Sequence, residues 1–204
     1  MAENWKWSTP YLGVTMSSNL SWNAHITKIV SKANRMLGFI RRNLYNCPRQ
    51  LKETAYVSMV RPNLEYCSTV WSPYTESDSH RIEMVQRRAA RFVTGEYRRT
   101  TSVTGLLTGL GWNTLAQRRD NSSVMAMYKI VNQLVEIDGS PYLMPVLCKT
   151  RQHHSQCFRQ IQCSIRPYQG SFFPRTISLW NSLPADVVEA PTLEAFRTRL
   201  KATY

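Results

Sequence analysis

From Val60 to Val93 the sequence reads VRPNLEYCSTVWSPYTESDSHRIEMVQRRAARFV, and its second half predicts a helix with two different sides. With helical spacing, the apolar residues fall together on one side: Ile82, Val85, Ala89, Phe92 and Val93. The basic residues take the remaining surface, with Arg87 and Arg91 opposite and Arg81 and Arg88 on the flank. Gly95 stands where a C-terminal helix cap is expected. Such a helix buries one side and presents a cationic side to solvent or to phosphates.

The composition of the 204-residue chain indicates a folded protein with an anionic partner. Hydrophobic residues make up 43%, which is enough for a core, and the net charge of +13 favours nucleic acid as the partner. Five cysteines without framework spacing, and no apolar signal segment, indicate a reducing intracellular compartment, the nucleus or the cytoplasm. No apolar run approaches membrane-spanning length, so we expect no membrane partner.

Residues 23–43 repeat the two-sided design. Their apolar stripe comprises Ile26, Ile29, Val30, Ala33, Met36, Leu37 and Ile40. We expect phosphate contacts from the basic sides of both helices, namely Lys28, Lys32, Arg35, Arg42, Arg87, Arg88 and Arg91, and in second place from Arg118 and Arg119. Phe39 projects among the basic residues and is the aromatic candidate for contact with nucleic acid. The alternative is that these sides are merely solvated.

The rest of the chain predicts a mainly α protein. Other helices are expected after Pro48 as far as Pro62, over a short apolar stretch ending at Pro73, and at 102–111, 113–135, 172–180 and 191–200. Two strands are expected, at 11–16 without an obvious pairing partner and at 157–165. We therefore expect a lead-in at 1–10, a helical domain at 11–138 and a smaller α+β region at 139–204.

An ordered set of short motifs resembles one family. The motifs are YLGV (11–14), LSW (20–22), HI (25–26), VRPNLEYC (60–67), VWSP (70–73), VQRRAAR (85–91), LAQRR (115–119), FP (173–174) and WNSLP (180–184). In this order they resemble the segment that follows the catalytic palm of LINE-type (non-LTR) retrotransposon reverse transcriptases, most of all jockey-like and chicken-repeat-like elements. The match runs from about Tyr11 to the end of the chain.

The resemblance implies a thumb-like helical bundle that grips a template–primer duplex along its backbone. The implied partners are RNA, an RNA–DNA hybrid or a DNA duplex, with a separate palm-bearing chain as a further candidate. The family holds catalytic Mg²⁺ on paired palm aspartates, whereas the aspartates here are widely separated, at Asp78, Asp120, Asp138 and Asp186. We therefore expect a non-catalytic piece of an RNA-directed DNA polymerase that is no enzyme on its own and needs no cofactor.

Two other interpretations stay open. The chain could be a protein-interaction module whose basic sides meet acidic protein surfaces. It could also be a decayed copy of a mobile element without a selected role, although its apolar stripes are intact. Because the strand at Tyr11 lacks an obvious partner, we expect the N-terminus to be frayed.

Several chemistry-bearing residues are better explained by packing. The spacing of Cys148, His153, His154, Cys157 and Cys163 fits neither a zinc knuckle nor paired Cys-x-x-Cys hooks, so no metal is expected. His25 is expected to pack or to cap the first helix. Three aromatics in apolar stretches are expected in the core: Tyr66, Trp71 and Trp180.

Overall fold

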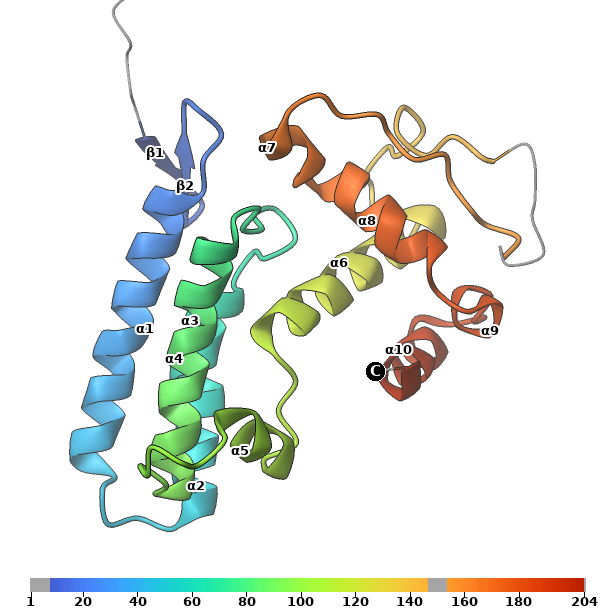
Figure 1. Ribbon diagram of the computed structural model, residues 1–204. Coiled ribbons are helices and arrows are strands. Elements are labelled where there is room, and N and C mark those ends of the chain that lie inside the picture. Colours follow the sequence, from blue (N-terminus) through green and yellow to red (C-terminus); the bar gives the residue numbers. More distant parts are fainter. Residues whose placement is uncertain (1–7, 147–153, 204) are drawn as a thin grey trace, which may run out of the picture. The chain divides into compact units, whose positions relative to one another are not determined.

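The computed structural model describes residues 8–146 and 154–203, and its chain is mainly α, as predicted (Figure 1). Helices make up 58% of it and strands 5%, so helix packing decides the fold. The chain divides into two compact units. The first comprises Met1–Ser68 with Pro73–Arg118, and the second comprises Thr69–Ser72 with Arg119–Tyr204.

The described part of the first unit begins with a β-hairpin. Strand β1 (Ser8–Tyr11) pairs antiparallel with β2 (Val14–Ser17). Leu12 and Gly13 form the turn between them, with φ values of 45° and 86°, and two positive φ angles suit the right-handed twist of a hairpin. The prediction of one unpaired strand over 11–16 is therefore wrong, because its partner lies in the segment assigned to the lead-in. The expected fraying of the N-terminus thereby loses its premise.

Three helical stretches form the bundle of the first unit. Helix α1 (Asn23–Asn43) has the predicted bounds. The second stretch runs through α2 (Arg49–Ala55), the π-helical turn η1 (Tyr56–Val60) and α3 (Arg61–Glu65). Pro62 does not end this stretch, because it lies in the first turn of α3, where a missing N–H costs little; before it, the Arg61 N–H donates to the carbonyl of Tyr56 across the π turn. Helix α4 (Glu76–Thr94) is the third.

The chain turns away from helix after Glu65. Cys67 has a φ of 53°, in the left-handed region; residues 66–70 form turns, and the chain continues to Pro73 without regular structure. The short apolar helix expected to reach Pro73 is therefore absent. Tyr66 is also 56% exposed instead of buried, whereas Trp71 is fully buried as expected.

Helices α1 and α4 run parallel and side by side (Figure 1). Side-chain hydrogen bonds join Thr27 to Arg81 and Asn34 to Arg88, and both pairs are separated by 54 positions. This constant offset means that the two helices keep one register. Their predicted apolar stripes supply most of the buried residues of these two helices, namely Ile26, Ile29, Ala33, Leu37 and Ile40 from α1 and Ile82, Val85, Ala89, Phe92 and Val93 from α4.

Helix α5 (Val103–Gly109) follows, and the Ser102 hydroxyl accepts from the N–H of Gly105 as its cap. Helix α6 (Leu115–Val131) begins in the first unit and continues into the second. After Arg118 it contributes Val124, Met127 and Tyr128 to the core of the second unit. The predicted boundary at 138 thus lies inside that unit.

The second unit is built around Trp180. Its other helices are α7 (Arg166–Gln169), α8 (Phe172–Asn181), α9 (Ala185–Val188) and α10 (Leu193–Thr203). Trp180 is fully buried and stacks on Phe196, which stacks in turn on Tyr128, with ring centroids 6.0 and 4.3 Å apart.

The strand predicted at 157–165 is absent from the residues that the structure describes. An isolated bridge between Pro145 and Phe158 is the β structure there. The side chain of Asn181 takes the place of a neighbouring strand, because it accepts from the Phe158 N–H at 3.0 Å and donates to the Phe158 carbonyl at 2.7 Å. Alternation of apolar residues therefore arises here without a sheet.

Candidate nucleic-acid interface

Helix α1 presents a row of cations on one side. Lys28, Lys32, Arg35 and Arg42 are all exposed, at helical spacings that keep them on one side. The helix contains five Lys or Arg residues and no Asp or Glu. Among the described residues, none of these four forms a salt bridge. They lie on this side because the opposite, apolar side is buried against α3, η1 and α4.

Phe39 lies on the same helix and is 49% exposed. Its outward position agrees with the prediction that it projects on the basic side. An exposed phenyl ring offers a flat face beside the cations, which is the combination that single-strand binders use for bases and phosphates.

The arginines of α4 are largely engaged within the protein. Arg88 is exposed, but its Nη1 donates to Asn34 Oδ1 of α1 at 3.2 Å. Arg91 is half-buried and its Nη1 donates to the carbonyl of Arg98 at 3.2 Å. Arg87 is half-buried. The structure therefore gives these three residues less freedom to reach phosphates than the sequence predicts.

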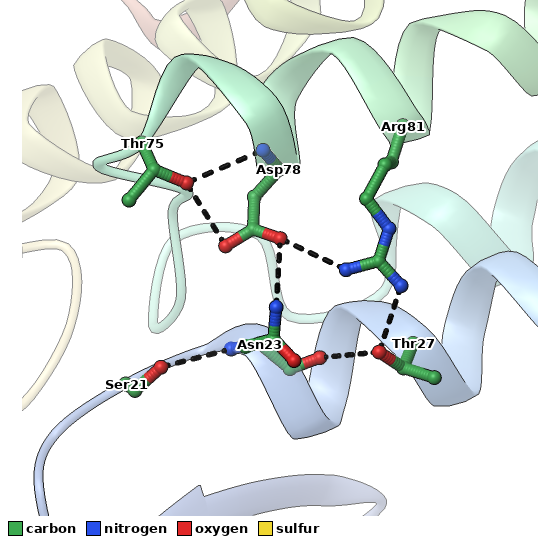
Figure 2. Close-up of polar contacts among 6 residues, drawn as sticks. All are labelled: Ser21, Asn23, Thr27, Thr75, Asp78 and Arg81. Carbon is green, nitrogen blue, oxygen red and sulfur yellow. Dashed lines mark hydrogen bonds and ion pairs between the residues drawn. The ribbon is translucent and has the colours of Figure 1, made fainter.

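A polar cluster joins the first turns of α1 and α4 (Figure 2). Asp78 accepts from Asn23 Nδ2 at 3.3 Å and from Arg81 Nη1 at 3.0 Å. Thr75 caps α4 by accepting from the Asp78 N–H at 3.2 Å. Arg81 also donates to Thr27 Oγ1 at 2.8 Å, so one guanidinium holds both helices. This arginine is structural.

The two residues placed second for phosphate contact are not on an open surface. Arg118 forms a two-pronged ion pair with Glu65, and this hydrogen bonding raises the pKa of Arg118. Arg119 is only 2% exposed. The expectation that they touch nucleic acid is corrected accordingly, because one is neutralised by a carboxylate and the other is buried.

His25 is a packing residue, as predicted. It is 1% exposed, and its Nδ1 accepts the N–H of Thr15 from strand β2 at 3.2 Å. Burial, helped by the charge of Lys28, lowers the pKa of His25 to about 4. The imidazole therefore stays neutral at physiological pH and ties the hairpin to α1.

Tyr66 also contacts the hairpin. Its hydroxyl donates to the carbonyl of Leu12 at 3.1 Å. A Cβ at Gly13 would lie 3.2 Å from the Tyr66 ring, so a glycine suits this close approach as well as the positive φ.

The cysteine and histidine residues near the second unit do not gather into a recognisable metal site in the described part of the chain. Cys148 and His153 lie outside the described residues. His154 is buried, with Nε2 at 3.0 Å from the Trp180 carbonyl and Nδ1 accepting the N–H of Gln156 at 3.2 Å. Both ring nitrogens are thus used by the backbone.

The sequence prediction did not include a surface cleft at the C-terminal end of α1. Its lining comprises Gly38, Arg41, Arg42, Tyr45 and Tyr97. The tyrosines lie outside the helices, in the segments that follow α1 and α4, so helical periodicity carries no signal for them. Only the parallel register of the two helices brings these segments together.

Within the described residues, no helix is both long enough and apolar enough to cross a membrane. Comparisons of the chain with protein-family models, with curated proteins and with solved structures found no match. The resemblance to LINE-type reverse transcriptases therefore rests on the motifs quoted above.

Proposed function

We propose that this chain binds nucleic acid through the exposed side of α1, as a non-catalytic C-terminal part of a LINE-type reverse transcriptase. The observation that carries the proposal is the row formed by Lys28, Lys32, Arg35 and Arg42 on a helix without a carboxylate. The net charge of +13 and the order of the family-like motifs support it.

The mode of binding that this row supports is contact with the phosphate backbone. Its cations extend over 14 positions, which corresponds to about 21 Å along a helix. Contacts of this kind release counterions, so affinity falls steeply with salt and depends little on sequence. The proposed role is to position a template–primer duplex, with bond-forming chemistry supplied by a palm-bearing chain.

The palm-bearing chain is a second proposed partner. The hairpin and the segment after it expose four apolar side chains, Tyr11, Leu12, Met16 and Leu20, at 66%, 74%, 42% and 58%. A hydrophobic surface of this kind is typical of a protein contact. Replacing Tyr11 and Leu12 with serine should abolish co-purification with a palm-bearing polymerase chain, and unchanged co-purification would count against this partner.

The test of nucleic-acid binding is fluorescence anisotropy with a labelled RNA–DNA hybrid, titrated across salt. One variant changes Lys28, Lys32 and Arg35 to alanine. Its matched control changes Arg87, Arg88 and Arg91 to alanine and so removes the same charge. We expect the first variant to lower the salt slope by about 2–3 units, and the control by at most about 1 unit.

Equal losses in the two variants would show that net charge, and not the row on α1, governs binding. A wild-type chain that fails to bind the hybrid would overturn the proposal. Acidic protein partners would then become the leading alternative. A broad, non-cooperative unfolding transition would instead favour a decayed copy.

A further inference from the structure

The cleft at the end of α1 combines aromatic rings with guanidinium groups. It has a volume of about 640 Å³ and is lined by Gly38, Arg41, Arg42, Tyr45 and Tyr97. Tyr45 is 71% exposed and Tyr97 is 52% exposed. The cleft therefore places two exposed aromatic rings beside two cations, which is the composition of surfaces that bind single-stranded nucleic acid.

The protein holds these groups in place by ordinary helix-end chemistry. Leu44 caps the C-terminal end of α1, its N–H donates to the Ile40 carbonyl, and Tyr45 follows directly. Gly95 caps the C-terminal end of α4 with a φ of 74°, and Tyr97 lies two residues after it. The Arg91 guanidinium then donates to the carbonyl of Arg98 and fastens this turn to α4. Arg91 is therefore a positioning residue for the cleft.

The charge around the cleft selects an anion. Among the described residues that line it are two arginines and no carboxylate, and the exposed Arg98 and Arg99 follow Tyr97 in the chain. The nearest acid in sequence is Glu96, which is half-buried and accepts from the Thr101 hydroxyl at 3.4 Å. Arginine planes and tyrosine rings together match a phosphate and a base.

We infer that this cleft binds unpaired nucleotides of a single strand, with bases stacked on Tyr45 and Tyr97 and phosphates held by Arg41 and Arg42. A base inside a duplex has both faces covered by its neighbours, so successive bases can stack on two tyrosines only where the strand is unpaired. This inference deepens the proposed function and rests on it, because the strand would continue from the duplex held along α1. Arg42 belongs to both the row and the cleft.

The experiment compares three labelled ligands by anisotropy: a blunt RNA–DNA hybrid, the same hybrid with a single-stranded overhang, and the overhang strand alone. The variant is Tyr45→Ser with Tyr97→Ser. Tyr11→Ser is the matched control, because Tyr11 is equally open to solvent but lies on the hairpin. Tyr45→Phe with Tyr97→Phe keeps the rings and removes only the hydroxyls. Circular dichroism checks that each variant is folded.

In the wild type we expect the overhang to tighten binding by roughly tenfold or more over the blunt hybrid. The serine variant should lose this advantage and keep its affinity for the blunt hybrid. The phenylalanine variant and the Tyr11→Ser control should both keep the tighter binding of the hybrid with the overhang. An overhang advantage that survives in the serine variant, or that never exists, overturns the inference.

The two proposals fail in different ways. If the wild type does not bind the blunt hybrid but binds the single strand through the tyrosines, the duplex-positioning function is overturned and the cleft stands. If the hybrid binds and the overhang adds nothing, the cleft is overturned and the function stands. If none of the ligands binds, both are overturned.

Discussion

Helices α1 and α4 have the same sequence pattern but employ their cations differently. Each buries an apolar side and carries basic residues on the other. The cations of α1 lie open in a row, whereas Arg81, Arg88 and Arg91 of α4 donate to other parts of the protein. A helical wheel therefore shows on which side of the helix a residue lies, but not which groups of the rest of the protein lie beside that side.

The cause lies in the neighbours of each helix. Helix α4 contains Glu76, Asp78 and Glu83 and is contacted by α1, α2 and α5. Carboxylates and backbone carbonyls are thus within reach of its arginines. Helix α1 has no acidic residue, so its cations find no partner on their own helix. The cations of α1 are therefore more available to phosphates than those of α4, because α4 has more hydrogen-bond acceptors close to its arginines.

The largest loss of stability is expected where the two helices are alike, in their buried apolar sides. Ile26 of α1 and Ile82 of α4 are both fully buried. Changing either one to alanine should lower the free energy of unfolding of the first unit by about 2–4 kcal/mol, through lost burial and a cavity. Native-state hydrogen exchange of the α1 and α4 amides would measure this for that unit alone. A loss in only one variant would show that the apolar sides are not equivalent.

The second prediction concerns the pH dependence of stability, to which α1 and α4 contribute differently. Helix α1 buries His25, whose pKa is lowered to about 4, whereas α4 buries Gln86, which does not titrate. Because the unfolded chain binds a proton near pH 6.5 and the folded chain does not, stability from this group is complete above pH 6.5. It is lost as the pH falls toward 4, by about 3 kcal/mol.

The control for this pH dependence is His25→Asn, whose side-chain oxygen can still accept from the Thr15 N–H but does not titrate. Urea unfolding between pH 7 and 4 should show a smaller loss of stability in this variant than in the wild type. Parallel curves for the two proteins would contradict the assignment.

These helices also show how far sequence reasoning reaches. The bounds of α1, the Gly95 cap and the apolar stripes were predictable, because helical periodicity and capping are local properties. The hairpin was missed because its turn has Leu12 at positive φ, where glycine or asparagine is the usual signal. The strand expected at 157–165 was wrong because a side chain, that of Asn181, takes the backbone partners of a sheet.

The candidate site was predictable to a similar extent. The exposed row on α1 follows from the wheel alone. The burial of Arg119, the pairing of Arg118 with Glu65 and the cleft with Tyr45 and Tyr97 all depend on contacts between distant segments. Such contacts leave no periodic trace in the sequence.

A smaller effect concerns the cluster that joins the two helix starts. Asp78→Asn keeps the shape of the side chain but removes the charge that holds Arg81 and offers an N–H group where an acceptor is needed. We expect a loss of about 1–2 kcal/mol in urea unfolding. Glu76→Gln is the matched control, since Glu76 is exposed in the same first turn, and it should cost only about 0.3–1 kcal/mol. Equal losses of stability in the two variants would show that Asp78 acts only through its charge near the N-terminus of α4, and not through its hydrogen bonds in the cluster.

The smallest effect has opposite signs in the two helices. Gly95 caps α4 at a φ of 74°, and none of the residues that the structure describes lies within 4 Å of a Cβ placed there, so Gly95→Ala should destabilise by about 1 kcal/mol through backbone strain alone. Gly38 lies inside α1, where a Cβ would meet Arg42 Nη1 at an ordinary 3.5 Å. Gly38→Ala should therefore stabilise by about 0.5–1 kcal/mol, because the unfolded chain loses freedom and the helix loses no contact. Urea unfolding midpoints measure both changes. If the midpoints of Gly95→Ala and Gly38→Ala shift in the same direction, backbone conformation does not explain the stability change in one of these variants.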